Sequence, residues 1–213
     1  MKNEKTAKSH IDGDSYLKLT GDTEAFLQAA ELLEERICNM KIEPSNMNRI
    51  GGSTGWIIHD IWESLKTASH FNFGIAFELR MKSILKLNVN QEQNLKIGHN
   101  LEKIYSLISS EIWQELEDIF TREVRRNSLH LSAFVRSKYE YADPPPNRNL
   151  NDLKDFCIYF DKDMKLWLKR YSWEDLSEKT HVHYFEDLSP LINFVRKAEK
   201  TGNCLARELG IIK

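Results

Sequence analysis

The sequence predicts an all-α protein, a multi-helix bundle organised around one long central helix. Apolar residues recur every three or four positions through several segments, which is the spacing that places side chains on one face of an α-helix. The longest such segment runs from residue 56 to residue 87, about eight turns, and contains no proline. Hydrophobic residues make up 41% and charged residues 29% of the 213-residue chain, as in folded soluble proteins, so we expect one compact body.

The first part of the chain lacks this periodicity. We therefore expect a flexible leader over residues 1–20, with Tyr16 and Leu19 able to pin its end to the body, and a single helical domain over residues 21–213. Asp22 occupies an N-cap position. The apolar residues behind it predict a first helix: Ala25, Phe26, Ala29, Ala30, Leu33 and Ile37.

The long helix follows a connecting loop, which Pro44 and the neighbouring glycines predict for residues 43–55. Within the helix, Glu78 and Lys82 stand four residues apart, so they share one side and lie within ion-pair reach. Two interpretations stay open. The pair either fixes how this helix meets its neighbours, or it places Glu78 at the mouth of a ligand or nucleic-acid cleft.

A polar turn over residues 88–98 is expected to precede a short helix that His99 or Asn100 can cap. Another helix begins near Ser110 or Glu111, and we expect it to reach the basic stretch at its far end. The three prolines within residues 143–147 must break it, because proline lacks an amide donor and disfavours a helical residue before it.

Two more helices are predicted in the last third of the chain. Apolar spacing indicates one over residues 150–167, and Ser189–Pro190 predicts the start of the last, with Ser as the cap and Pro in the first turn. Residues 171–184 are ambiguous between them, because apolar and histidine residues alternate near 180–184, which would suit a short extended piece.

Composition narrows the class of protein. No apolar run approaches the roughly 18 residues that a membrane span needs, and the start of the chain lacks the apolar centre of a secretory signal. We therefore expect a cytoplasmic protein without membrane contact. Cys38, Cys157 and Cys204 are interpreted as small core residues in a reducing compartment, with no disulfide.

The formal net charge of −2 gives the whole molecule no strong attraction for nucleic acid. Nucleic-acid binding would then need a local patch, although a basic run is more often the solvated face of a helix. The candidate patch consists of Arg122, Arg125, Arg126, Arg136 and Lys138.

One segment resembles a known family. Residues 68–85, with the run Ala76-Phe-Glu78-Leu-Arg-Met-Lys82, are followed by a polar turn and Gly98-His99-Asn100-Leu101. This order is similar to the core signature of the HEPN superfamily of helical domains. Residues 134–141, which include Arg136 and Tyr139, resemble the Arg-Tyr element that ends many such domains. The resemblance covers about residues 56–170, which would leave a C-terminal helical extension.

The resemblance implies a metal-independent endoribonuclease whose site combines an Arg with a His about four to six residues later, often with a polar residue after the Arg. The matching segment supplies Arg125, Arg126, Asn127 and His130. Arg125 has the family spacing, whereas Arg126 has the polar follower Asn127 but stands one residue too close. On a regular helix Arg126 and His130 share a face, whereas Arg125 and His130 diverge by about 140°, so Arg125 needs a helix end or a partner subunit.

The chemistry implied is transesterification, in which a base takes the proton of a ribose 2′-hydroxyl that attacks the adjacent phosphorus. His130 suits proton transfer and an arginine fork suits the phosphate. Ser132 stands where some family toxins have a Tyr, which departs from the pattern. No metal or cofactor is expected. The expected RNA-binding residues are Arg122, Arg136, Lys138, Tyr139, Glu78 and Lys82.

The setting that the resemblance implies is a toxin–antitoxin or phage-defence system, with a homodimer and an antitoxin or defence partner protein. The alternative is a catalytically inactive module that binds RNA, a nucleotide or a partner protein. His99 is interpreted as a capping or packing residue. His181 and His183, with two acidic residues nearby, match no strong metal-ligand motif.

Overall fold

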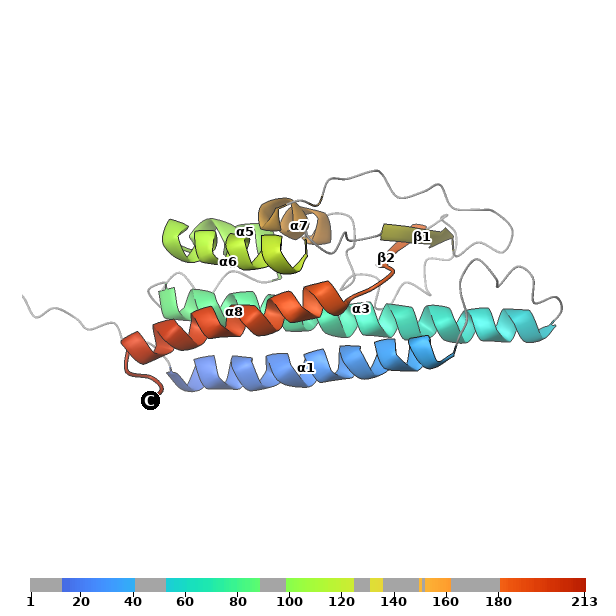
Figure 1. Ribbon diagram of the computed structural model, residues 1–213, viewed down its shortest axis with the longest axis horizontal. Coiled ribbons are helices and arrows are strands. Elements are labelled where there is room, and N and C mark those ends of the chain that lie inside the picture. The colour runs from blue at the N-terminus through green and yellow to red at the C-terminus, as the bar shows by residue number, and fades with distance from the viewer. Residues whose placement is uncertain are drawn as a thin grey trace, which may run out of the picture.

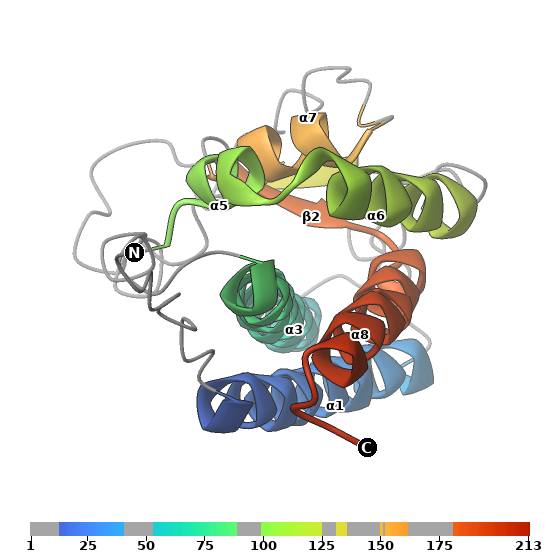
Figure 2. The ribbon, with the colours of Figure 1, turned by 90° about the vertical axis from the view of Figure 1, so that its left-hand side faces the viewer.

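The computed structural model describes residues 13–40, 53–88, 99–124, 131–135, 150, 152–161 and 181–213. Its fold is all-α, as predicted. The helices are α1 Gly13–Asn39, α3 Ser53–Asn88, α5 Leu101–Leu107, α6 Ser110–Glu123, α7 Leu153–Tyr159 and α8 Ser189–Glu208. Viewed along the bundle in Figure 2, α3 lies between α1 on one side and α5, α6 and α7 on the other, with α8 beside it. None of the helices in the described part of the chain is long and apolar enough to cross a membrane.

The first helix begins earlier than predicted. Helix α1 starts at Gly13, so residues 13–20 are helical and the expected N-cap at Asp22 lies inside the helix. Tyr16 is 1% exposed, packs beside Leu87 and Ala206, and donates its hydroxyl proton to Asn203 Oδ1 over 2.9 Å. The expectation that Tyr16 pins this segment to the body is therefore confirmed, while the remainder of the leader lies outside the described residues.

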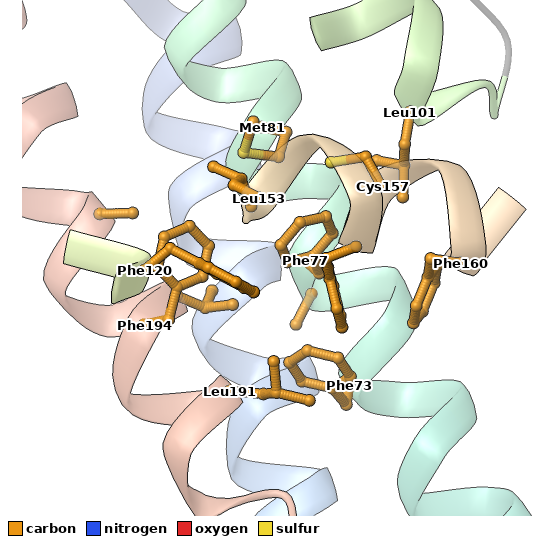
Figure 3. Close-up of a cluster of buried hydrophobic side chains, with 14 of the residues drawn as sticks. Phe73, Phe77, Met81, Leu101, Phe120, Leu153, Cys157, Phe160, Leu191 and Phe194 are labelled. Carbon is orange, nitrogen blue, oxygen red and sulfur yellow. The ribbon is translucent and has the colours of Figure 1, made fainter. Parts of the chain in front are cut away.

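Aromatic rings fill the centre of the core (Figure 3). Phe77 of α3 packs against Phe156 of α7 with ring centroids 5.2 Å apart, and against Phe160 and Phe194 at 5.9 Å. Offset and edge-on ring pairs at these distances stabilise a core beyond the area that they bury. The aromatic cluster thus joins α3, α7 and α8 around Phe77, one residue before Glu78.

Helix starts agree with the sequence in two places. Asn100 Oδ1 accepts the backbone N–H of Lys103 over 2.7 Å, so Asn100, of the two residues considered, caps α5. Helix α8 begins at Ser189 with Pro190 in its first turn, as predicted. Its N-cap is Leu188 rather than Ser189, and the Ser189 N–H is bound by Asp187 Oδ1 over 2.8 Å.

The helix expected to reach the basic stretch is shorter than predicted. Helix α6 ends at Glu123, where the Val124 N–H still bonds Phe120 O over 2.8 Å. Strand β1, Leu131–Val135, then lies beside β2, His181–Phe185 (Figure 1). The two strands pair antiparallel, with Leu131 opposite Phe185. The prediction of a continuous helix is therefore wrong, whereas the extended alternative for the ambiguous stretch is confirmed over residues 181–185.

The cysteines also depart from the prediction in part. Cys157 is buried in the core, as expected, but Cys38 and Cys204 are exposed on their helices. The prediction that Cys38 and Cys204 are core residues is therefore wrong. All three are free thiols, so no disulfide joins them.

Candidate functional site

The predicted catalytic residues Arg125, Arg126, Asn127 and His130 lie outside the described residues, as do Arg136, Lys138 and Tyr139. Arg126 and His130 share a face only on a regular helix. The described residues on either side of this stretch do not form one helix, because α6 ends at Glu123 and residues 131–135 form a strand.

Three predicted binding residues are described. Arg122 is exposed near the end of α6, where its Nε donates to Asp118 O of its own helix over 3.2 Å. Glu78 and Lys82 form the expected ion pair, with Lys82 Nζ 2.5 Å from Glu78 Oε1. The structure therefore brings Glu78 and Lys82 together.

A third side chain meets this pair. His99 Nδ1 lies 2.9 Å from Glu78 Oε1 and 3.0 Å from Oε2. The Glu78 side chain is 6% exposed, whereas the His99 side chain is 76% exposed. The arrangement is an exposed imidazole attached to a nearly buried carboxylate, with the half-buried ammonium of Lys82 beside it. We call Glu78, Lys82 and His99 the imidazole site.

The protonation of the ring follows from its partner. An ionised carboxylate only accepts hydrogen bonds, so the proton on Nδ1 of His99 points to Glu78. In the neutral ring the basic nitrogen is then Nε2. A carboxylate that orients an imidazole in this way prepares it to accept a proton at Nε2 and to return it later.

Local sequence explains why His99 lies here. Leu101 is 1% exposed and packs into the core, and Asn100 caps α5, so the two residues after His99 are fixed. Glu78 follows the core residue Phe77 on α3, which keeps its carboxylate at the edge of the core. Sequence reasoning missed the contact of His99 with Glu78. Both residues belong to the quoted signature, but helical periodicity does not relate residues on two different elements.

A second carboxylate lies near the imidazole site. Asp161, directly after the core residue Phe160, accepts the backbone N–H of Glu102 at Oδ2 over 2.9 Å. Burial raises the pKa of Asp161, the hydrogen bonds from Glu102 and Leu101 oppose this, and the charges of Glu102 and Glu78 add to the rise. Its other oxygen, Oδ1, is buried and has no hydrogen-bond partner among the described residues.

A separate buried polar cluster joins α1, α3 and the end of β2. Lys66 Nζ donates to Glu34 Oε2 over 2.8 Å and to Glu186 O over 2.9 Å, and Ser69 Oγ donates to Glu34 Oε1 over 2.5 Å. The Lys66 and Glu34 side chains are only 4% and 15% exposed. Because these charged groups face one another and the backbone, we interpret this cluster as structural.

Within the described part of the chain, no group of three or more His, Cys, Asp or Glu residues is arranged to hold a metal ion. The side chains of His181 and His183, considered above, lie outside it.

Comparison with known proteins finds no family model that matches this chain and no solved structure that matches it. The resemblance to the HEPN superfamily therefore rests on the quoted residues alone.

Proposed function

We propose that this protein is a HEPN-like endoribonuclease that cleaves RNA by 2′-hydroxyl transesterification, without a metal, in a toxin–antitoxin or phage-defence setting. The observation that carries the proposal is the hydrogen bond between His99 Nδ1 and Glu78, beside Lys82. It supplies a proton-transfer group and a cation at one exposed place.

The reaction uses these groups as follows. A base removes the proton of the 2′-hydroxyl, and the oxygen attacks the adjacent phosphorus. The bond from phosphorus to the 5′-oxygen breaks, a 2′,3′-cyclic phosphate forms, and the 5′-oxygen takes up a proton. An imidazole performs such proton transfers near neutral pH, and a nearby cation stabilises the charge that gathers on the phosphoryl oxygens.

Two histidines are therefore candidates for proton transfer. His130, with Arg125 or Arg126, is the one that the family resemblance implies, and His99 is the one whose orienting contact the structure describes. The proposal includes a homodimer, which the family resemblance implies, with helices from both chains lining a shared cleft.

A catalytically inactive HEPN-like module is the second candidate, and it would bind RNA, a nucleotide or a partner protein. The near burial of Glu78 favours it, because a nearly buried carboxylate beside Lys82 suits a structural pair.

The first experiment measures cleavage of single-stranded RNA by the purified full chain in EDTA. We expect 2′,3′-cyclic phosphate ends, loss of activity in His130→Ala, and a loss of about 10²-fold or more in His99→Ala, the usual worth of a proton-transfer group. Lys103→Ala is the matched control, because Lys103 is exposed and lies on α5, the short helix that follows His99. This variant should retain activity. Circular dichroism checks that each variant keeps its helical content.

Full activity in both histidine variants would overturn the catalytic assignment. Salt-sensitive RNA binding with no cleavage by the unaltered protein would support the inactive module instead, because contacts to phosphate weaken as salt rises. A further experiment mixes the inactive chains Arg125→Ala and His130→Ala. Restored cleavage in the mixture would support a site shared between two subunits, and no restoration would count against sharing.

A further inference from the structure

We propose that Asp161 is a positioning residue for the imidazole site, and that it holds His99 against Glu78 by fixing the first turn of α5. This inference rests on the proposed function for its catalytic consequence, but the positioning itself can be measured without RNA. Asp161 stands 62 residues beyond His99 in the sequence, and no sequence pattern connects the two.

The core fixes where Asp161 lies. The ring of Phe160, the preceding residue, is fully buried and packs against Phe73 and Phe77 of α3, with ring centroids 6.1 and 5.9 Å apart. Figure 3 shows Phe160 and Phe77 pointing into the same aromatic cluster from α7 and α3. The backbone of Asp161 is therefore anchored on the same stretch of α3 that carries Glu78.

The carboxylate of Asp161 then fixes the start of α5. Its Oδ2 accepts the Glu102 N–H over 2.9 Å, and the Leu101 N–H also bonds to this side chain. The first N–H groups of a helix have no carbonyl partner within the helix, so a side chain from elsewhere can bind them. Asn100 Oδ1 binds the next such group, the N–H of Lys103. Three consecutive amides of the turn after His99 are thus held by side-chain oxygens.

These contacts form a closed path. It leads from Phe77 of α3 through Phe160 and Asp161 to the first turn of α5, and back through His99 to Glu78, the neighbour of Phe77. A reacting group that is held in this way already has the orientation that the reaction needs, so little free energy is lost in orienting it. For the same reason, a small displacement away from the reacting atoms can lower the rate.

The surroundings of Asp161 disfavour the charged form of its carboxyl group. Its Oδ1 is buried without a hydrogen-bond partner among the described residues, and burial raises its pKa. A neutral amide could accept the same backbone N–H through its oxygen. Asp161→Asn therefore separates the hydrogen bond, which the proposal needs, from the negative charge, which it does not.

The experiment follows the imidazole of His99 by ¹⁵N and ¹³C NMR in the full chain, with Asp161→Ala, Asp161→Asn and the matched control Asp152→Ala. Asp152 caps the neighbouring helix α7 by binding the Asp155 N–H over 2.7 Å, so its removal is a comparable loss of a cap elsewhere. We expect Asp161→Ala to lose the preference for the Nδ1–H form of His99, while Asp161→Asn and Asp152→Ala keep it.

In the RNA assay, we expect Asp161→Ala to lower kcat by about tenfold with KM unchanged, and Asp161→Asn to restore it, because only the orientation of His99 differs. An unchanged His99 spectrum in Asp161→Ala would overturn the proposal, and so would its loss in Asp161→Asn. If Asp161→Ala does not fold, Asp161→Glu, which moves the carboxylate by one methylene, should shift the same signals, and an unchanged spectrum would overturn the proposal. If the unaltered protein does not cleave RNA, the proposed function fails but the spectra still decide the positioning.

Discussion

The imidazole of His70 accepts a hydrogen bond from the backbone N–H of Phe185, with 2.7 Å between Nε2 and N. On the other side of the ring, Nδ1 lies 2.8 Å from Lys66 O, which can only accept. Since a backbone N–H only donates and a carbonyl only accepts, His70 must be neutral with its proton on Nδ1. This buried ring joins the middle of α3 to the end of β2.

The stability of the fold should therefore fall in acid. Burial, with the charge of Lys66 as the next cause, lowers the pKa of His70 from 6.5 to about 3. Above pH 6.5 the ring is neutral in both the folded and unfolded states. Between pH 6.5 and about 3 only the unfolded state binds the proton, so stability falls by up to roughly 1.4 kcal/mol per pH unit.

Urea unfolding at pH 7, 5.5 and 4.5, compared between the unaltered chain and His70→Gln, measures this contribution. The comparison is needed because burial raises the pKa of Asp161 and of Glu117, and these carboxyl groups favour the folded state as the pH falls. The His70→Gln variant should lose less stability than the unaltered chain over this range. Equal losses in the two proteins would contradict the assignment.

Lys66→Met should be strongly destabilising. It leaves the nearly buried Glu34 without its cation and removes the donor for Glu186 O. Breaking one partner of a buried pair typically costs about 3–5 kcal/mol. Lys197→Met, which breaks the more exposed pair with Glu123, is the control and should cost less than about 1 kcal/mol. Chemical denaturation measures both, and equal effects would show that the buried cluster is not structural.

Arg80 should respond differently from its partner Glu199. The Arg80 side chain is 1% exposed, its Nη2 lies 3.0 Å from Glu199 Oε2, and its Nε and Nη1 have no partner among the described residues. Glu199→Gln leaves a buried guanidinium poorly compensated, whereas Arg80→Met removes the buried charge itself. We therefore expect Glu199→Gln to lower the melting temperature more than Arg80→Met does. The reverse order would mean that the ion pair adds net stability.

Phe77→Ala should destabilise the core by about 3–5 kcal/mol, because it leaves a cavity where three rings meet. Leu32→Ala changes a side chain that is 66% exposed and should stay within about 0.5 kcal/mol. Urea midpoints compare the two variants. A small effect of Phe77→Ala would show that the aromatic cluster repacks around the loss.

The features that the sequence predicts correctly depend on residues that are close together in the chain. The Glu78–Lys82 pair, the Asn100 cap and the start of α8 at Ser189 are local patterns, and each is present. The first turns of α1 were missed because residues 13–20 bury little besides Tyr16, so their apolar stripe is weak.

The other missed features depend on partners that are distant in the sequence. Strand β1 is stabilised by pairing with β2, 50 residues later, and a five-residue strand carries too little pattern to override a helical reading. The contact of His99 with Glu78 joins two elements, as does that of His70 with Phe185. The fold class could therefore be predicted from periodicity, whereas the site could be predicted only as residues of a signature, without their contacts.

Two residues of helix α3, eight positions apart, bind other parts of the fold: His70 binds the backbone of β2, and Glu78 binds the imidazole of His99. Along an uninterrupted helix this separation is about 12 Å, and it is set by the pitch rather than by any loop. The helix is thus a spacer of fixed length between the end of β2, which His70 holds, and the turn at His99, which Glu78 holds.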